Sequence, residues 1–265
     1  MDPRHFVTLN ERVVFAQFFG LPILYGTFYP IIGDKIAIFW VVIFSLLSFI
    51  YFIKLTSLIF GIKSRKYAAV VFLATIPLLY HMNMPYLNMN GGITFFIIGS
   101  YYFIKFYQLS KLKECLLASL FFSISIFFRY EFSIFIALFL IITLFIKYKT
   151  NLRAYIKPCL INIVIITLLT VIPIFLLNYE VYGNPLKYGM SVLEVYSINR
   201  EVTPFWKIFL PYQVIPEIIT ANIYRFFFRM LPLVTLLGIF GVISFLKSRI
   251  PNQYILLYSF FLFIY

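Results

Sequence analysis

Charged residues are scarce in this sequence, and their scarcity excludes an ordinary soluble domain. Only 12% of the 265 residues are Asp, Glu, Lys or Arg, whereas soluble domains carry about 25%. Hydrophobic residues make up 63% of the chain and occur in long runs, as the apolar interior of a bilayer requires. The sequence therefore predicts a membrane protein.

The motifs of common soluble enzymes are also missing. The sequence has no glycine-rich phosphate loop with a lysine, no His-Glu-Xaa-Xaa-His zinc motif and no Gly-Xaa-Ser-Xaa-Gly elbow. Two isolated histidines, His5 and His81, do not make a metal site. The two cysteines, Cys115 and Cys159, lack metal-ligand spacing and are expected to be small apolar fillers. No cofactor is indicated, and the sequence leaves a divalent metal open.

The apolar runs predict an all-α fold, a polytopic transmembrane bundle of about eight helices in a single domain over residues 1–265. A helix needs about 20 apolar residues to cross a bilayer, and shorter helices thin it or are shielded by neighbours. We expect helices at 36–60, 68–80, 93–107, 115–128, 132–146, 156–177, 231–246 and 254–265. The last run reaches Tyr265 without a polar flank, and no helix is expected before residue 34. We therefore expect a fragment of a longer reading frame, truncated at both ends.

One apolar stretch has two interpretations. Residues 115–146 form either one long helix with Arg129 and Glu131 in its middle, or two short helices that turn at 128–131. The turn keeps the lysines on both sides of this stretch on one face of the membrane, and it avoids the few kcal/mol that a charge at the bilayer centre costs. We therefore predict a helical hairpin with Arg129 and Glu131 at its outer end.

With this topology the loops separate acidic from basic residues. Eight of the nine acids fall in outer segments, at 1–34, 129–131 and 178–230, and only Glu114 does not. The opposite loops hold Lys63, Arg65, Lys66, Lys111, Lys113, Lys147, Lys149, Arg153, Lys157, Lys247 and Arg249. Because basic loops resist translocation, this side is predicted to be cytoplasmic. The net charge of +13 thus indicates orientation in a membrane and not binding to nucleic acid.

The longest outer segment, at 178–230, is too aromatic for a flexible linker. Its stretch 204–211 mixes aromatic, aliphatic and basic side chains, which is typical of segments that lie among lipid headgroups. Pro204, Pro211 and Pro216 predict short interfacial helices in this loop and not one long helix.

Polar residues on the outer side are the candidates for chemistry. A carboxylate can act there as a general base, and arginine can hold a phosphate with two parallel hydrogen bonds. The candidate substrate-binding residues are Arg129, Glu131, Glu180, Asn184, Arg225 and Arg229. For some of these residues a purely structural role is the alternative to substrate binding. Arg225 and Arg229, at i and i+4, suit interfacial anchors. Arg129 and Glu131 can neutralise each other, and Asp34 is expected to cap the first helix.

Three stretches carry a resemblance to a known family. The first is Gly20-Leu21-Pro22-Ile23-Leu24-Tyr25 with Tyr29-Pro30, and the second is Phe60-Gly61-Ile62-Lys63-Ser64-Arg65, followed by Ile76-Pro77. The third is Asn178-Tyr179-Glu180-Val181-Tyr182-Gly183-Asn184-Pro185-Leu186. In this order and on these sides of the membrane they resemble the GT-C superfamily of integral-membrane glycosyltransferases. That group includes protein O-mannosyltransferases and aminoarabinose transferases.

The resemblance implies an inverting transfer of a sugar from a polyprenyl- or dolichyl-phosphate carrier to an acceptor on the outer face of the membrane. The family's catalytic acid lies in the first outer loop, ahead of its Pro-Leu-Tyr stretch. Asp2 matches that position best, and Glu11 is second. The family's acidic pair is not intact here, because Pro3 follows Asp2. Near the place of a further acid, the sequence has Asn88 and Asn90.

The sequence thus predicts a multi-pass glycosyltransferase of a prokaryotic plasma membrane and cell envelope, with its active face exoplasmic. Its predicted partners are the lipid-linked sugar and the bilayer. Frequent Ile, Phe, Lys and Asn are typical of an AT-rich prokaryotic genome. Two other classes stay open. A transporter or flippase of lipid-linked saccharides would place polar groups and broken helices deep in the membrane. A non-catalytic membrane subunit would need none of the outer acids.

Overall fold

The computed structural model describes residues 6–9, 12–15, 19–74, 88–109, 111–130 and 132–186, which are helical apart from one two-stranded hairpin. The strands are β1 (Phe6–Leu9) and β2 (Arg12–Phe15). The helices are α1 (Gly20–Ile32), α2 (Ile36–Phe60), α3 (Arg65–Ala74), α5 (Asn88–Leu109), α6 (Leu112–Phe128), α7 (Phe132–Ile166) and α8 (Ile172–Tyr182). Short 3₁₀ helices at Gly33–Lys35 and Ile62–Ser64 flank α2, and a π-helix at Thr167–Val171 joins α7 to α8.

Several of the predictions fall outside these ranges. They are the helices at 231–246 and 254–265, most of the loop at 178–230, and the candidates Asp2, Glu11, Glu131, Arg225 and Arg229.

Several helix boundaries agree with the expectations from sequence. α2 covers the predicted 36–60. α6 ends at Phe128 and α7 begins at Phe132, so the chain breaks at the predicted turn. Gly61 follows α2 with a φ of 87°, a conformation that glycine adopts without the steric cost of a Cβ atom. The helical fold class is therefore confirmed for the described residues.

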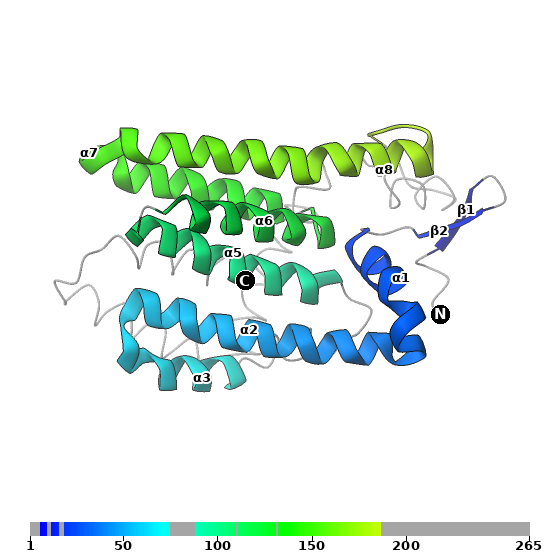
Figure 1. The fold of residues 1–265 in the computed structure, drawn as a ribbon, viewed down its shortest axis with the longest axis horizontal. Helices are drawn as coiled ribbons and strands as arrows, with labels where there is room; N and C mark the ends of the chain where they lie inside the picture. Colours follow the sequence, from blue (N-terminus) through cyan, green and yellow to red (C-terminus); the bar gives the residue numbers. More distant parts are fainter. Residues whose placement is uncertain are drawn as a thin grey trace, which may run out of the picture.

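The N-terminal segment differs from the expectation of an outer segment without a helix. β1 pairs antiparallel with β2, Phe6 opposite Phe15, and α1 is a helix of 13 residues. A helix of this length is about 20 Å long, too short to cross a bilayer, and it lies obliquely beside the start of α2 (Figure 1). The prediction that Asp34 caps the first long helix is also wrong. Lys35 occupies the N-cap position of α2 and makes no side-chain cap, and Asp34 lies one residue earlier, where its carboxylate accepts a hydrogen bond from the Tyr29 hydroxyl at 3.0 Å.

α2 and α5 are neighbours that run in the same direction. The hydroxyl groups of Ser48 on α2 and Thr94 on α5 are 2.7 Å apart and buried. Further along both helices, Gln108 on α5 donates a hydrogen bond to the carbonyl oxygen of Leu58 on α2, at 3.2 Å. α3 lies on the opposite side of α2, so α3, α2 and α5 form successive rows in Figure 1.

α5 and α6 pack closely and run antiparallel. The Ser125 hydroxyl donates to the carbonyl oxygen of Gly92 at 2.7 Å, and Lys105 pairs with Glu114 at 3.2 Å at the other end. Gly99 permits the close approach, because a Cβ atom there would lie 2.5 Å from the ring of Phe122. Small residues bring helices together in this way inside membranes, where van der Waals packing drives their association.

α7 bends back on itself, although its 35 residues are all helical. A straight helix would place Asn162 about 45 Å from Phe132. The Phe132 ring instead packs on Phe96, which also contacts Phe122 of α6. Three residues from Phe122, Ser119 donates a hydrogen bond to Asn162 at 2.6 Å. The first part of α7 therefore runs antiparallel to α6 and the last part parallel to it, as expected for separate helices at 132–146 and 156–177.

Two stretches of the described chain are long and apolar enough to cross a membrane, Gly20–Phe60 and Ile156–Tyr182. The core helices of soluble proteins can be equally long and apolar, but they are mostly buried. In each of these two stretches, only 17% of the most apolar segment is buried. Large apolar side chains such as Ile38 (67% exposed) and Leu176 (64%) point outward. This exposure favours lipid as the surroundings of both stretches.

Candidate functional site

The packing directions place the helix termini at two opposite ends of the bundle (Figure 1). At one end, which we call the arginine end, α2, α5 and α7 begin and α6 and α8 finish. At the other, which we call the lysine end, α2 and α5 finish and α3 and α6 begin.

The described charges at the arginine end are Asp34, Lys35, Arg129 and Glu180. Those at the lysine end are Lys63, Arg65, Lys66, Lys105, Lys111, Lys113, Glu114 and Lys157, and Lys54 lies less than two turns before α2 finishes there. The separation along the sequence is thus also a separation in space, and which end faces the cytoplasm stays a prediction.

Arg129 is held at the point where α6 finishes. Its backbone is extended, with φ −154° and ψ 121°, and its N–H still bonds to the carbonyl oxygen of Ser125 at 3.1 Å. The guanidinium Nη1 donates to the sulfur of Met89, in the first turn of α5, at 2.8 Å. The side chain is partly buried. A permanently charged group therefore lies at the boundary of the bundle and is positioned by two helices.

Glycines bring α1 and α5 against the end of α6. A Cβ atom at Gly20 would lie 2.8 Å from the Cα atom of Phe128, and one at Gly91 would lie 2.3 Å from the Phe128 ring. That ring is 3% exposed and packs on Phe44 and Phe95. The residue before Arg129 is thus fixed from three sides, which limits the positions that the guanidinium can reach.

The end of α8 uses polar side chains to close its own turn. Gly183 adopts a left-handed conformation (φ 71°) and its N–H bonds to the carbonyl oxygen of Tyr179 at 2.8 Å. The buried Asn178 donates to the carbonyl oxygen of Pro185 at 3.1 Å, and the Asn184 side-chain oxygen accepts from the N–H of Leu186 at 2.9 Å. This segment, one of the three stretches behind the family resemblance, forms an ordered helix terminus.

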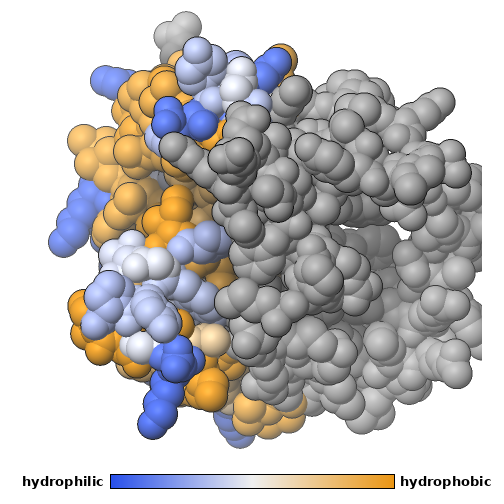
Figure 2. Space-filling view, turned by 90° about the vertical axis from the view of Figure 1, so that its right-hand side faces the viewer, coloured by the Kyte–Doolittle hydropathy of each residue, from blue (hydrophilic) through white to orange (hydrophobic). Residues whose placement is uncertain are grey.

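Of the candidate residues, the structure describes Arg129, Glu180 and Asn184, and it brings them to one end of the bundle. Phe127, two residues before Arg129, packs against the cluster of Phe19 and Tyr182. Glu180 is exposed, and the side-chain oxygen of Asn184 is already engaged in its turn. Figure 2 looks onto this end, where hydrophilic and hydrophobic side chains alternate over the described surface.

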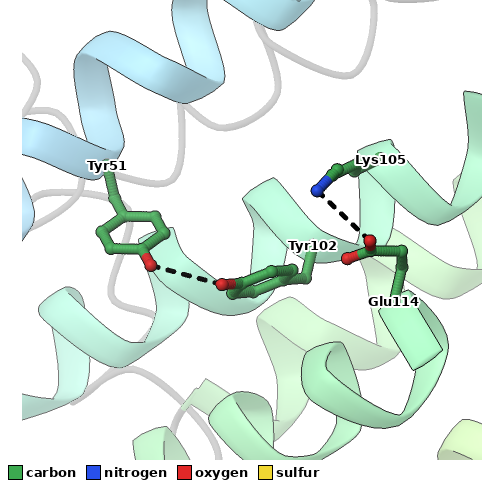
Figure 3. A network of polar contacts seen from close by, with 4 residues as sticks. All are labelled: Tyr51, Tyr102, Lys105 and Glu114. Carbon is green, nitrogen blue, oxygen red and sulfur yellow. Dashed lines mark hydrogen bonds and ion pairs between the residues drawn. The ribbon is translucent and has the colours of Figure 1, made fainter.

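A polar network lies at the lysine end, and none of its residues was a candidate functional residue in the sequence analysis. Figure 3 shows the ion pair between Lys105 and Glu114 (3.2 Å) and the hydroxyl contact between Tyr51 and Tyr102 (3.3 Å). The Lys105 ammonium also lies 5.8 Å from the ring centroid of Tyr101 and 6.0 Å from that of Tyr102. One signal did point here, because Glu114 is the one acid that breaks the charge sorting. Its pairing with Lys105 explains that exception.

Cys115 does more than fill space. It is fully buried and accepts a hydrogen bond from Asn162 Nδ2 at 3.0 Å, while Ser119 donates to the Asn162 side-chain oxygen at 2.6 Å. Asn162 Nδ2 also donates to the carbonyl oxygen of Pro158 at 3.0 Å. These polar groups join α6 to the second part of α7 and satisfy one another in an apolar interior.

Comparisons with known proteins leave the family resemblance as a prediction. The chain matches no protein-family model, no curated protein and no solved structure. Within the described ranges, no group of three or more His, Cys, Asp and Glu side chains is placed to hold a metal ion. The functional argument therefore depends on the geometry of the two ends.

Cysteines introduced singly at Lys35 and Lys111 are expected to react from opposite sides of a sealed membrane. Both side chains are exposed, one at each end of the bundle. The natural cysteines Cys115 and Cys159 are 0% and 2% exposed and should not react with the maleimide. A membrane-impermeant maleimide applied to right-side-out and inverted vesicles measures the outcome. Labelling of both positions from the same side would contradict the arrangement of the helices.

Proposed function

We propose that this chain is a multi-pass enzyme of the plasma membrane that transfers a sugar from a polyprenyl-phosphate carrier to an acceptor on the outer face. The observation that carries the proposal is the position of Arg129 at the arginine end, opposite the cations of the lysine end. With the lysine end in the cytoplasm, as the positive-inside rule expects, Arg129 meets the outer headgroup layer. About eight helices would form the full bundle.

Arg129 is the residue best suited to the carrier phosphate. A guanidinium offers five donors and pairs with phosphate oxygens through two parallel hydrogen bonds. Met89 takes one of these donors, and sulfur is a weak acceptor that a phosphate oxygen can replace. The contact with α5 would thus hold the group in place until substrate arrives.

The proposed reaction is a single displacement. A carboxylate of Asp2, or otherwise of Glu11, takes the proton of the acceptor hydroxyl. The hydroxyl oxygen then bonds to the anomeric carbon as the bond from that carbon to the phosphate oxygen breaks, with inversion. The carrier phosphate leaves with the electron pair, and Arg129 stabilises its charge.

Glu131, Arg225 and Arg229 are further candidates for binding the carrier, and Glu180 for binding the acceptor. Asn184 stays a candidate for binding substrate, and its side-chain oxygen also orders the turn after α8.

Replacing Asp2 and Glu11 together with alanine is expected to abolish transfer, because no proposed base remains. Arg129→Ala should lower kcat about 100-fold, the effect of losing one group that stabilises developing charge, and Arg129→Lys should retain part of the activity. Lys35→Ala, an exposed cation at the same end, is the matched control and should be neutral. The assay measures release of carrier phosphate and the product anomer with the full chain in liposomes. Normal transfer by the Asp2/Glu11 variant would refute the proposal.

One observation favours a second candidate function, a transporter or flippase of lipid-linked saccharides. The stretch Ile156–Tyr182 contains the π-helix Thr167–Val171, with the buried Thr170 inside it. π-helices occur often at functional sites, and interrupted helices line transport paths. The same liposome assay separates the two functions. An enzyme releases carrier phosphate, whereas a transporter moves the intact lipid-linked sugar between leaflets and releases none.

A further inference from the structure

The lysine end carries an exposed cationic surface. Six side chains form it: Lys63, Arg65 and Lys66 around the start of α3, Lys111 and Lys113 around the start of α6, and Lys157 of α7. We call this set the basic surface. All six are exposed.

Two contacts bring the three parts of the basic surface together. Gln108 donates a hydrogen bond to the carbonyl oxygen of Leu58 at 3.2 Å, which joins the last turn of α5 to the last turn of α2. The Cys115 thiol donates to the carbonyl oxygen of Pro158 at 3.7 Å, which places the residue after Lys157 beside the first turn of α6. The cations therefore project from adjacent turns at the same end of the bundle.

The described acid at this end does not neutralise the basic surface. Glu114 pairs with Lys105 at 3.2 Å, and its side chain is only 9% exposed. Lys105 is not one of the six exposed cations, so the pair is neutral by itself. The positive charge of the basic surface therefore lacks compensation from the described residues around it, and it attracts anions.

Apolar side chains border these cations. Ile62 is 73% exposed and Tyr67 64%, on either side of Lys63, Arg65 and Lys66. Leu109 is 49% exposed and Leu112 57%, on either side of Lys111. A soluble anion or a nucleic acid needs only the cations. A phospholipid presents a phosphate and acyl chains together, and thus matches both parts of this surface.

We propose that the basic surface binds the phosphate headgroups of anionic phospholipids in the leaflet that the lysine end faces. The bound lipids hold the turns between α2 and α3 and between α5 and α6 at the membrane boundary. This binding site lies at the opposite end of the bundle from Arg129 and does not depend on sugar transfer.

The test measures lipid retention by the full chain. Protein in a neutral detergent is mixed with equal amounts of phosphatidylglycerol and phosphatidylcholine, and native mass spectrometry counts the bound lipids. The wild-type protein is expected to prefer phosphatidylglycerol at least about tenfold at low salt. The preference should fall at about 1 M salt, where the screening length is about 3 Å. Equal retention of the two lipids would overturn the proposal without any variant.

A matched pair of variants locates the binding. Lys111→Gln removes one cation from the basic surface, and Lys35→Gln removes one exposed cation from the arginine end. Lys111→Gln should lower the preference about fivefold, the usual effect of one cation near a charged surface, whereas Lys35→Gln should leave it unchanged. Equal effects of the two would overturn the proposal. Displacement of the lipid by millimolar inorganic phosphate would also overturn it, because the site would then bind any phosphate.

Discussion

Replacing Lys105 with methionine is expected to lower the free energy of unfolding by about 3 kcal/mol, because it leaves a buried carboxylate without its cation. The partner Glu114 has a side chain that is only 9% exposed, and within the described structure its Oε2 atom makes no hydrogen bond. Lys54→Met is the matched control. Lys54 is an exposed lysine that contacts the ring of Tyr51 at 4.8 Å, and its replacement should cost at most about 1 kcal/mol.

The two halves of this ion pair should not be equally important. Glu114→Gln leaves Lys105, which is 32% exposed and also contacts two tyrosine rings, so water and the rings compensate its charge. We expect a loss of about 1 kcal/mol for this change. The double variant Lys105→Met with Glu114→Leu should be more stable than Lys105→Met alone, because no charge stays buried. Unfolding in detergent, followed by circular dichroism, measures all of these variants. Additive losses would show that the two groups do not interact.

Replacing Gly91 with valine is expected to destabilise the protein by about 3 kcal/mol, because the new side chain overlaps a rigid aromatic cluster. A Cβ atom at Gly91 would lie 2.3 Å from two carbon atoms of the Phe128 ring. That ring cannot move aside cheaply, since it packs on the rings of Phe44 and Phe95. Because Phe128 precedes Arg129, the same change should also displace the guanidinium and lower the proposed sugar transfer beyond the loss of stability.

Gly26 provides the control for this prediction. It is a helical glycine of α1, and a Cβ atom there would meet nothing within 4 Å. Gly26→Val should therefore change stability by less than about 0.5 kcal/mol, the difference between the helix propensities of the two residues. Combining Gly91→Val with Phe128→Leu should cost less than the sum of the single changes, because leucine gives way where the ring cannot. An additive result would place the strain elsewhere.

The long apolar helix α2 was predictable from the sequence, and the short elements of the N-terminal segment were not. The limits of α2 agree with its apolar run because charged or flexible residues flank it, Asp34 and Lys35 before and Gly61 after. α1 escaped prediction because its 13 residues cannot span a bilayer. The pairing of β1 with β2 joins short runs separated by two residues, and such short runs carry a weak pattern.

The position of Arg129 at a helix end was predictable from the sequence, and its contacts were less so. The sequence placed Arg129 at the end of a helical hairpin because charge sorting required a turn there, and α6 does finish at that point. Its contact with Met89 depends on the packing of α5 against α6, which no local pattern shows. In the same way, Asn184 suited a substrate contact by position. Its engagement with Leu186 follows from the left-handed turn at Gly183.

In the proposed multi-pass topology, the pairing of α5 with α6 has a consequence for how the chain enters a membrane. α6 begins three residues after α5 finishes, and the two helices satisfy each other's polar groups through Gly92 with Ser125 and through Lys105 with Glu114. A helix that left the translocation channel alone would expose one of these charges to acyl chains, at a cost of a few kcal/mol. Released as a preformed pair, the two helices avoid that cost. During synthesis, α5 should therefore stay in the translocation channel until α6 has been made, and the two helices should enter the membrane together as a hairpin.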